Sequence, residues 1–185
     1  MNIDVAFRDR CLLTVPGVLS AEACEAFITQ TEAQGYDEAP ITMPRGFVRQ
    51  PAIRNNQRVM VDDHDQATWL WQLLEPHVPA RYGGWNAVGL NERFRYYRYE
   101  RGEYFRWHYD GAYVRSPDER SALTLMVYLN EDFEGGSTDF DGAKTVVPRQ
   151  GMALVFDHGL RHQGASVERG RKYVLRTDVM YARPR

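Results

Sequence analysis

The part of the sequence that most constrains the fold begins near residue 90, where short runs of aromatic and β-branched residues follow one another. Gly, Pro, Asp and Asn interrupt these runs, as they commonly do between strands. The expected strands are Glu92–Tyr99, Tyr104–Asp110, Leu123–Leu129, Thr145–Val147, Met152–Phe156 and Lys172–Met180. Many short strands at this spacing favour an antiparallel barrel or a double-sheet jelly roll, because these architectures protect the sheet edges.

The first half of the chain has helical patterns. Ser20 is a suitable N-cap for a helix that runs to about Gln34, with Gly35 as its stop and a buried stripe formed by Cys24, Phe27, Ile28 and Thr31. A second helix is expected over Gln66–Glu75, where Pro76 ends the apolar stripe. Both helices are expected to support the strands.

The segment Pro40–Gln57 between these helices has no clear period, and it predicts a long loop that is a candidate substrate lid. With no repeat or linker to divide the chain, we expect one domain over residues 1–185. Its fold class is expected to be α+β and mainly β, with helical support in residues 1–89 and a jelly-roll (double-stranded β-helix) core in residues 90–185.

Composition excludes several classes of protein. The 185 residues are 43% hydrophobic, which is enough for a core, and 23 basic against 25 acidic residues give a formal charge of −2. We therefore expect neither a membrane nor a nucleic-acid partner. Arginines interleaved with tyrosines over residues 93–106 would suit a single strand of nucleic acid, but the solvated face of a strand is the commoner explanation. Two isolated cysteines and an N-terminus unlike a signal peptide favour the cytoplasm.

The first candidate site is His108-Tyr109-Asp110. Residues two apart in a strand project from the same face, so the imidazole and the carboxylate can reach one ion. The motif is weak by itself, because a histidine and an aspartate at a strand end can simply hydrogen-bond to each other.

A second region strengthens that candidate. His162 lies in a polar segment after the apolar strand Met152–Phe156. Two imidazoles and one carboxylate form the facial triad that binds iron(II) and leaves coordination positions open, although zinc remains an alternative on ligand type. His158 is the competing histidine, whereas His64 and His77 are expected to be surface or capping groups.

Longer segments resemble a known family. They are Tyr99-Glu100-Arg101-Gly102-Glu103-Tyr104-Phe105-Arg106-Trp107-His108-Tyr109-Asp110, Val127-Tyr128-Leu129-Asn130, Phe133-Glu134-Gly135-Gly136-Ser137-Thr138-Asp139-Phe140, Gly151-Met152-Ala153-Leu154-Val155-Phe156 and Gly170-Arg171-Lys172-Tyr173. With His162, these segments resemble, in order and spacing, the prolyl 4-hydroxylase-like branch of the iron(II)/2-oxoglutarate dioxygenases.

The resemblance implies iron ligation by His108, Asp110 and His162, and a salt bridge between Lys172 and the distal carboxylate of 2-oxoglutarate. It also implies that Tyr128 and Tyr99 help to hold this cosubstrate. The cofactors it implies are Fe(II), 2-oxoglutarate and dioxygen, with ascorbate as a further candidate. Two residues are less clearly placed: Thr138 matches a pocket-lining position where packing is the commoner role, and Arg176 is the rival of Lys172, because it shares its strand face four residues on.

The implied reaction is hydroxylation of a C–H bond, with a prolyl residue of a peptide or protein as the expected substrate. A free amino acid or another small molecule is the main alternative, and a metal-binding jelly roll without turnover is an alternative from another class. The segment Ala112–Ser121 is expected to be a loop beside the iron that matches no substrate-reading element of the family. The sequence predicts no oligomeric state.

Overall fold

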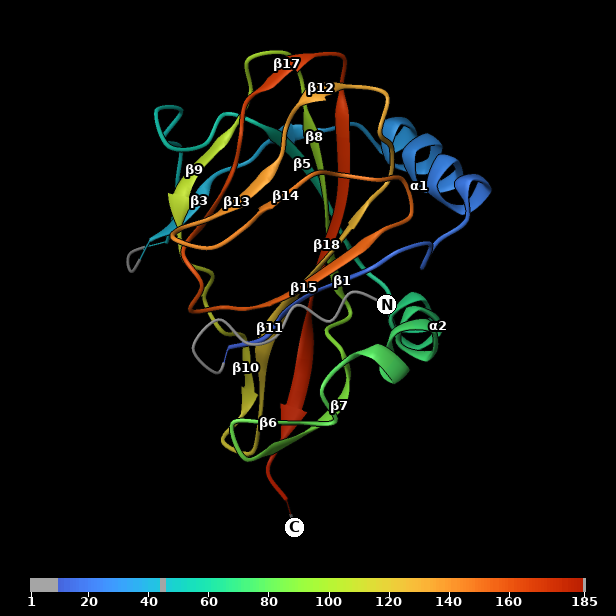
Figure 1. The fold of residues 1–185 in the computed structure, drawn as a ribbon, viewed down its shortest axis with the longest axis vertical. Coiled ribbons are helices and arrows are strands. Elements are labelled where there is room, and N and C mark those ends of the chain that lie inside the picture. The colour runs from blue at the N-terminus through green and yellow to red at the C-terminus, as the bar shows by residue number, and fades with distance from the viewer. Residues whose placement is uncertain (1–9, 44–45, 185) are drawn as a thin grey trace.

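The computed structural model describes residues 10–43 and 46–184. Residues 1–9, on which the argument against a signal peptide relied, lie outside this range. The described strands form a jelly roll, which confirms the expected fold class (Figure 1). Within the described residues, no helix is both long and apolar enough to cross a membrane.

The larger sheet of the described residues has ten strands. Its main path is β1 (Leu12–Val15), β15 (Ala153–Asp157), β11 (Glu119–Tyr128), β18 (Lys172–Ala182), β8 (Arg93–Tyr99), β5 (Gln57–Asp62) and β2 (Asp37–Glu38). The branches are β7 (Trp85–Leu90) on β18, β6 (Arg81–Tyr82) on β7 and β10 (Val114–Ser116) on β11. The pairs are antiparallel, and the long strand β18 lies between β11 and β8.

A smaller sheet faces the large one and consists of β14 (Thr145–Val146), β13 (Thr138–Phe140), β16 (His162–Gly164) and β9 (Phe105–His108). Two further pairs are β12 (Glu134–Gly135) with β17 (Val167–Arg169), and β3 (Ile41–Met43) with β4 (Gly46–Val48). Figure 1 shows the smaller sheet on one side of β18 and both helices on the other.

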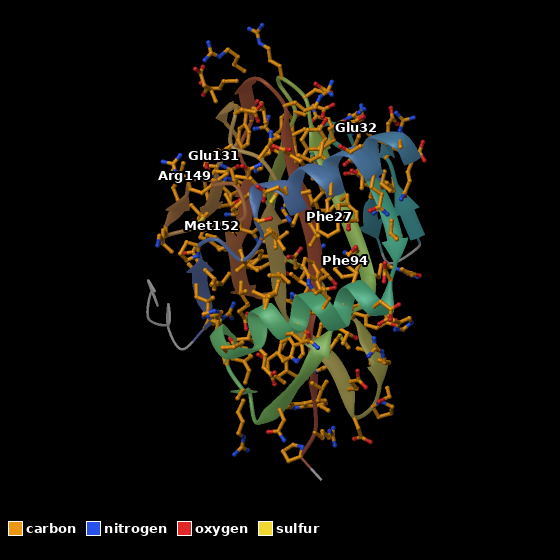
Figure 2. The ribbon with its side chains drawn as sticks, turned by 90° about the vertical axis from the view of Figure 1, so that its right-hand side faces the viewer. Phe27, Glu32, Phe94, Glu131, Arg149 and Met152 are labelled. Carbon is orange, nitrogen blue, oxygen red and sulfur yellow. The ribbon has the colours of Figure 1, made fainter. Side chains whose placement is uncertain are left out.

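The helices α1 (Ala21–Gln34) and α2 (His64–Leu74) confirm the two expected helices, and a 3-10 turn follows over Glu75–His77. Ser20 caps α1 by accepting a hydrogen bond from the Ala23 N–H at 3.2 Å. Gly35 ends the helix at φ 83°, a conformation that costs glycine little. Figure 2 shows α1 and α2 lying across the large sheet, with Phe27 and Phe94 between them.

Alternation along the central strands divides the core into two layers. On β8, Phe94 and Tyr96 pack under the helices, whereas Tyr97 and Tyr99 point between the two sheets. On β18, Leu175 joins the helix-side cluster, whereas Val174 lies between the sheets. The same alternation carries polar side chains from β8, β11 and β18 into the space between the sheets, where a site can form.

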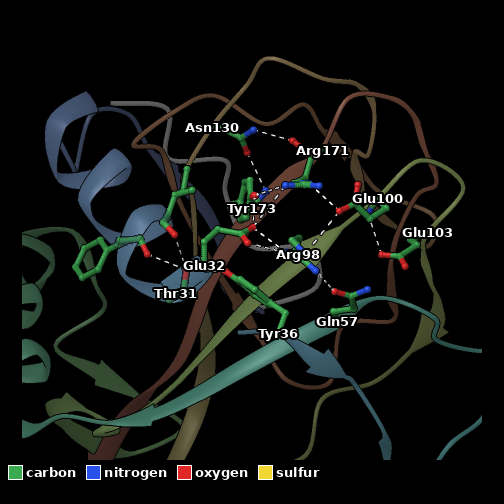
Figure 3. A network of polar contacts seen from close by, with 12 residues as sticks. Thr31, Glu32, Tyr36, Gln57, Arg98, Glu100, Glu103, Asn130, Arg171 and Tyr173 are labelled. Carbon is green, nitrogen blue, oxygen red and sulfur yellow. Dashed lines mark hydrogen bonds and ion pairs between the residues drawn. The ribbon is translucent and has the colours of Figure 1, made fainter. Parts of the chain in front are cut away.

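A polar network joins α1 to the large sheet (Figure 3). Glu32 contacts Arg98 at 2.8 Å, and it accepts a hydrogen bond from the Tyr173 hydroxyl at 2.5 Å. Arg95 pairs with the buried Asp178 at 3.5 Å. Arg95 and Arg98 of β8 therefore belong neither to an exposed basic groove nor to a simply solvated face, because both are largely buried and ion-paired within the fold.

Two segments expected to be loops contain paired strands, so those predictions were wrong in part. Within 40–57, β3 pairs with β4 and the Arg54 backbone bridges to Phe105. Within 112–121, β10 pairs with the start of β11. Both strand pairs are hairpins between segments that lie close in the sequence. Strands of only three residues, such as β3, β4 and β10, are too short for alternation to reveal them.

Candidate metal centre

The structure brings His108, Asp110 and His162 together, with one ligand atom of each within 4.8 Å of the others. His108 ends β9 and His162 begins β16, and the two residues are direct partners in the register of the smaller sheet. His162 was expected in a segment after a strand, but it opens a strand of its own. Asp110 lies just beyond β9, whose expected extent to residue 110 was too long, and its backbone N–H donates to His158 O at 3.2 Å.

Backbone carbonyls fix the orientation of both imidazoles. Nδ1 of His108 lies 2.6 Å from Arg106 O, and Nδ1 of His162 lies 2.9 Å from Leu160 O. A carbonyl only accepts, so each Nδ1 carries the proton and each Nε2 keeps a free lone pair. These Nε2 atoms lie 3.8 and 3.7 Å from the carboxylate oxygens of Asp110. The tautomers therefore suit a metal between the three side chains.

Aromatic rings enclose the imidazoles. Phe105 stacks on His108 with ring centroids 3.5 Å apart, and Phe156 meets His162 edge-on at 4.6 Å. This burial, together with the neighbouring His162, lowers the pKa of His108 to about 3, and burial also lowers the pKa of His162. Both imidazoles are therefore neutral at pH 7, which is the form that ligates metal.

Asp110 is held from two sides. Burial alone would raise its pKa, but Arg176, whose Nη2 lies 3.1 Å from Oδ1, keeps that pKa below its usual range. On the other side, the Thr124 hydroxyl donates to Oδ2 at 2.6 Å. An ionised carboxylate and two neutral imidazoles are a suitable donor set for iron(II).

His158, the competing histidine, is not among the three residues whose ligand atoms lie together, and its ring nitrogens contact hydroxyl groups instead. Its Nδ1 is 2.9 Å from the Thr124 hydroxyl, and its Nε2 is 2.8 Å from the Ser121 hydroxyl. Since Thr124 donates its proton to Asp110, it accepts from His158, and Ser121 then donates to the other ring nitrogen. His158 is thus positioned to orient Thr124, and through it Asp110.

Lys172 is 2% exposed, and it points into the same cavity as the three candidate ligands. Its Nζ donates to Gly136 O at 2.5 Å and lies 5.2 and 5.4 Å from the ring centroids of Tyr99 and Tyr128. Burial lowers the pKa of Lys172 to about 7, although the more distant Asp139 acts in the opposite direction. No carboxylate of the described residues is within ion-pair distance of this ammonium, so its charge is available to pair with an anionic ligand.

The other residues expected at the cosubstrate site lie near Lys172 or line the same cavity. Tyr128 and Thr138 share a hydrogen bond of 2.7 Å between their hydroxyls, and Tyr99 and Thr138 line the cavity. Gly136 lies against the Lys172 side chain, since a Cβ at Gly136 would come within 3.2 Å of it. Arg176 lines the cavity too, but its ion pairs are with Asp110 and Asp178.

Sequence reasoning missed Thr124, Phe105 and the contact between Arg176 and Asp110. Alternation along β11 could have pointed to Thr124, because it shares a face with Tyr128. No local pattern predicts that Phe105 stacks on His108, since both lie in one strand but their rings meet by rotamer choice.

A comparison with protein families supports the chemistry that the cavity suggests. Residues 94–177 match the 2OG-Fe(II) oxygenase superfamily. This part of the chain is therefore similar to members of that superfamily. The matched range contains His108, Asp110, His162 and Lys172, so the superfamily match and the cavity coincide. The match supports a 2-oxoglutarate-dependent dioxygenase, and this superfamily implies iron(II), 2-oxoglutarate and dioxygen as the cofactors.

Solved structures with the same fold cover nearly the whole oxygenase chain. A viral collagen prolyl hydroxylase from Paramecium Bursaria Chlorella virus-1 is 22% identical, with a TM-score of 0.63 over 92% of this chain and 96% of that one. A Pseudomonas putida prolyl-4-hydroxylase is 20% identical, with a TM-score of 0.68 over 94% and 92%. No curated protein matches the oxygenase by sequence.

A third solved structure contains a peptide. It is a prolyl hydroxylase from Trichoplax adhaerens in complex with a hypoxia inducible factor oxygen degradation domain peptide fragment. It is 14% identical to this oxygenase, with a TM-score of 0.68 over 91% of this chain and 82% of that one. At these identities, the likeness establishes the fold.

The support of Asp110 can be tested with Thr124→Val, which keeps the shape of the side chain but removes the hydroxyl. Loss of a residue that hydrogen-bonds to a metal ligand typically weakens metal binding by about 10–100-fold. We expect the affinity for Mn²⁺ to fall within this range. Calorimetric titration measures it. Thr177→Val is the matched control, because Thr177 is also buried but its hydroxyl donates to Asn91 O. Equal affinity in Thr124→Val and the parent protein would contradict the assigned role.

Proposed function

We propose that this oxygenase hydroxylates a prolyl residue of a peptide or protein, with iron held by His108, Asp110 and His162 and the distal carboxylate of 2-oxoglutarate held by Lys172. One observation carries the proposal: the three candidate ligands and the buried ammonium line one cavity between the two sheets. Substrate C–H, dioxygen and 2-oxoglutarate give the hydroxylated product, succinate and carbon dioxide. Bound iron(II) and 2-oxoglutarate would activate dioxygen, which is the oxidant of this reaction.

The residues of the chain do the binding and the positioning. His108 and His162 present their Nε2 atoms because backbone carbonyls hold Nδ1. Lys172 neutralises the distal carboxylate, and the same cavity is lined by Thr138, whose hydroxyl is hydrogen-bonded to that of Tyr128. Tyr99 and Met126 also line the cavity, and their apolar surface limits the access of water.

The surroundings of the cavity support a peptide substrate. On the face of Phe105 away from His108, the Arg54 guanidinium lies 4.5 Å from the ring centroid, and it borders a second pocket lined by Arg49, Gln50, Asn55 and Asn56. A ligand that occupies both pockets has to pass Phe105, which suits an extended chain better than a single amino acid. The prolyl hydroxylases among the structural relatives support the prolyl target.

Two finer points belong to the same proposal. The free thiols of Cys11 and Cys24 support a reducing compartment, the cytoplasm. Ascorbate is proposed as an additional reductant on the basis of the family resemblance alone.

The test is incubation with iron(II), 2-oxoglutarate and proline-containing peptides, followed by mass spectrometry of the peptide and measurement of succinate. We expect the peptide to gain one oxygen atom, in proportion to the succinate released. Free proline, in parallel, tests the small-molecule alternative. Succinate release with free proline but not with peptides would show that the substrate is a small molecule and not a prolyl peptide. Iron-loaded protein that releases no succinate at all would favour a binding module without turnover.

A further inference from the structure

A fixed positive charge lies beside the proposed metal site. The guanidinium of Arg176 contacts Asp110 Oδ1 at 3.1 Å and Asp178 Oδ1 at 3.4 Å through the same nitrogen, Nη2. A cation so close to a metal-binding carboxylate opposes a divalent metal, because it competes for the carboxylate and repels the ion. The contact is therefore unfavourable for metal binding unless another group offsets it.

Arg176 also has an unused hydrogen-bond donor. Its Nε is buried and lacks a hydrogen-bond partner among the described residues, although the side chain lines the proposed 2-oxoglutarate cavity. A buried N–H without an acceptor costs free energy, and a carboxylate is the acceptor that a guanidinium binds best. Lys172 lies on the same face of β18, four residues earlier, so the two cations can serve the two ends of one dicarboxylate.

The charges of the buried side chains around Asp110 also favour binding of the metal together with an anion. Without ligands, Arg176 and Arg95 balance Asp110 and Asp178, and these four side chains are between 3% and 20% exposed. A divalent metal adds two positive charges to this buried group, and the 2-oxo acid carboxylate removes one of them. Since uncompensated buried charge is costly, metal and anion stabilise each other here.

We propose that Arg176 couples metal binding to cosubstrate binding: it weakens the metal site while the cavity lacks an anion, and the 2-oxo acid end of 2-oxoglutarate neutralises it. This inference rests on the proposed function. Coupling of this kind is reciprocal, so the metal strengthens 2-oxoglutarate binding by the same factor. Arg176 is in this view a positioning residue that favours assembly of the complete site.

The experiment measures Mn²⁺ affinity by calorimetry with and without saturating 2-oxoglutarate, in the parent protein and in Arg176→Gln. The ratio of the two dissociation constants is the coupling factor. We expect Arg176→Gln to bind Mn²⁺ alone more tightly than the parent protein, and its coupling factor to fall by about tenfold, within the usual range of coupling between sites.

Arg95→Gln is the matched control, because it removes the same charge from the same network without a described contact to Asp110. We expect it to leave the coupling factor unchanged. If the Arg176→Gln variant does not fold because Asp178 has lost an ion-pair partner, the double variant Arg176→Gln/Asp178→Asn removes both charges of that pair. We expect the same fall of the coupling factor in the double variant.

These measurements distinguish a failure of the proposed function from a failure of the role assigned to Arg176. A parent protein that binds Mn²⁺ but not 2-oxoglutarate would contradict the proposed function. Normal binding of both ligands, with an unchanged coupling factor in Arg176→Gln or an equal fall in Arg95→Gln, would overturn the role of Arg176 alone. So would weaker binding of Mn²⁺ alone by Arg176→Gln, because that would make Arg176 a support of the metal site.

Discussion

Replacing His162 with alanine is expected to abolish metal binding and succinate release together. The residue is 4% exposed, and its Nε2 lies 3.7 Å from Asp110, so its replacement removes one of three proposed ligands. The loss of Mn²⁺ affinity should exceed the roughly 10–100-fold that removal of an outer partner costs. Calorimetry with Mn²⁺ measures the first effect, and succinate assays with iron(II) measure the second.

His158→Ala provides the matched comparison for this prediction. His158 is also a buried histidine, but its ring hydrogen-bonds to Ser121 and Thr124 and is not among the grouped ligand atoms. We expect this variant to retain metal and part of its activity. Retention of metal by His162→Ala, with its loss from His158→Ala, would show that the proposed ligand set is wrong.

The sequence could predict the parts of the site that depend on strand periodicity. His108 and Asp110 are two residues apart, and β18 carries Lys172 and Arg176 on one face, so their shared directions follow from the period of a strand. The jelly roll itself was predictable from the short strands after residue 90. These features are local or nearly so, and the family resemblance placed His162 with them.

Contacts between distant segments could not be predicted in the same way. The register that sets His162 opposite His108 depends on the pairing of β16 with β9, and the contact between Glu32 and Arg98 depends on how α1 packs on the sheet. Arg176 is the clearest case. The sequence made it the rival of Lys172 as the anchor of 2-oxoglutarate, but its guanidinium contacts Asp110, and only the assembled sheets determine which side chains meet in the cavity.

Binding of 2-oxoglutarate is expected to weaken as the pH rises above about 7, because burial lowers the pKa of Lys172 to about 7. The distal carboxylate binds the ammonium form and raises its pKa in the complex, so binding takes up a proton above that pH. Linkage then predicts a dissociation constant that is nearly constant below pH 7 and rises by up to about tenfold per pH unit above it. Calorimetry on Mn²⁺-loaded protein, in buffers of different ionisation enthalpy, measures both the affinity and the proton uptake.

Two variants separate the titration of Lys172 from other effects of pH. Arginine stays charged over this range, so Lys172→Arg should remove the pH dependence above 7 even if the longer side chain changes the affinity itself. Lys172→Met has no charge at any pH, so its binding should be weak throughout and nearly independent of pH. The same rise of the dissociation constant in all three proteins would assign the titration to another group. Parent-like affinity in Lys172→Met would remove Lys172 as the anchor, since a buried ammonium that pairs with the ligand cannot be replaced by a thioether without loss.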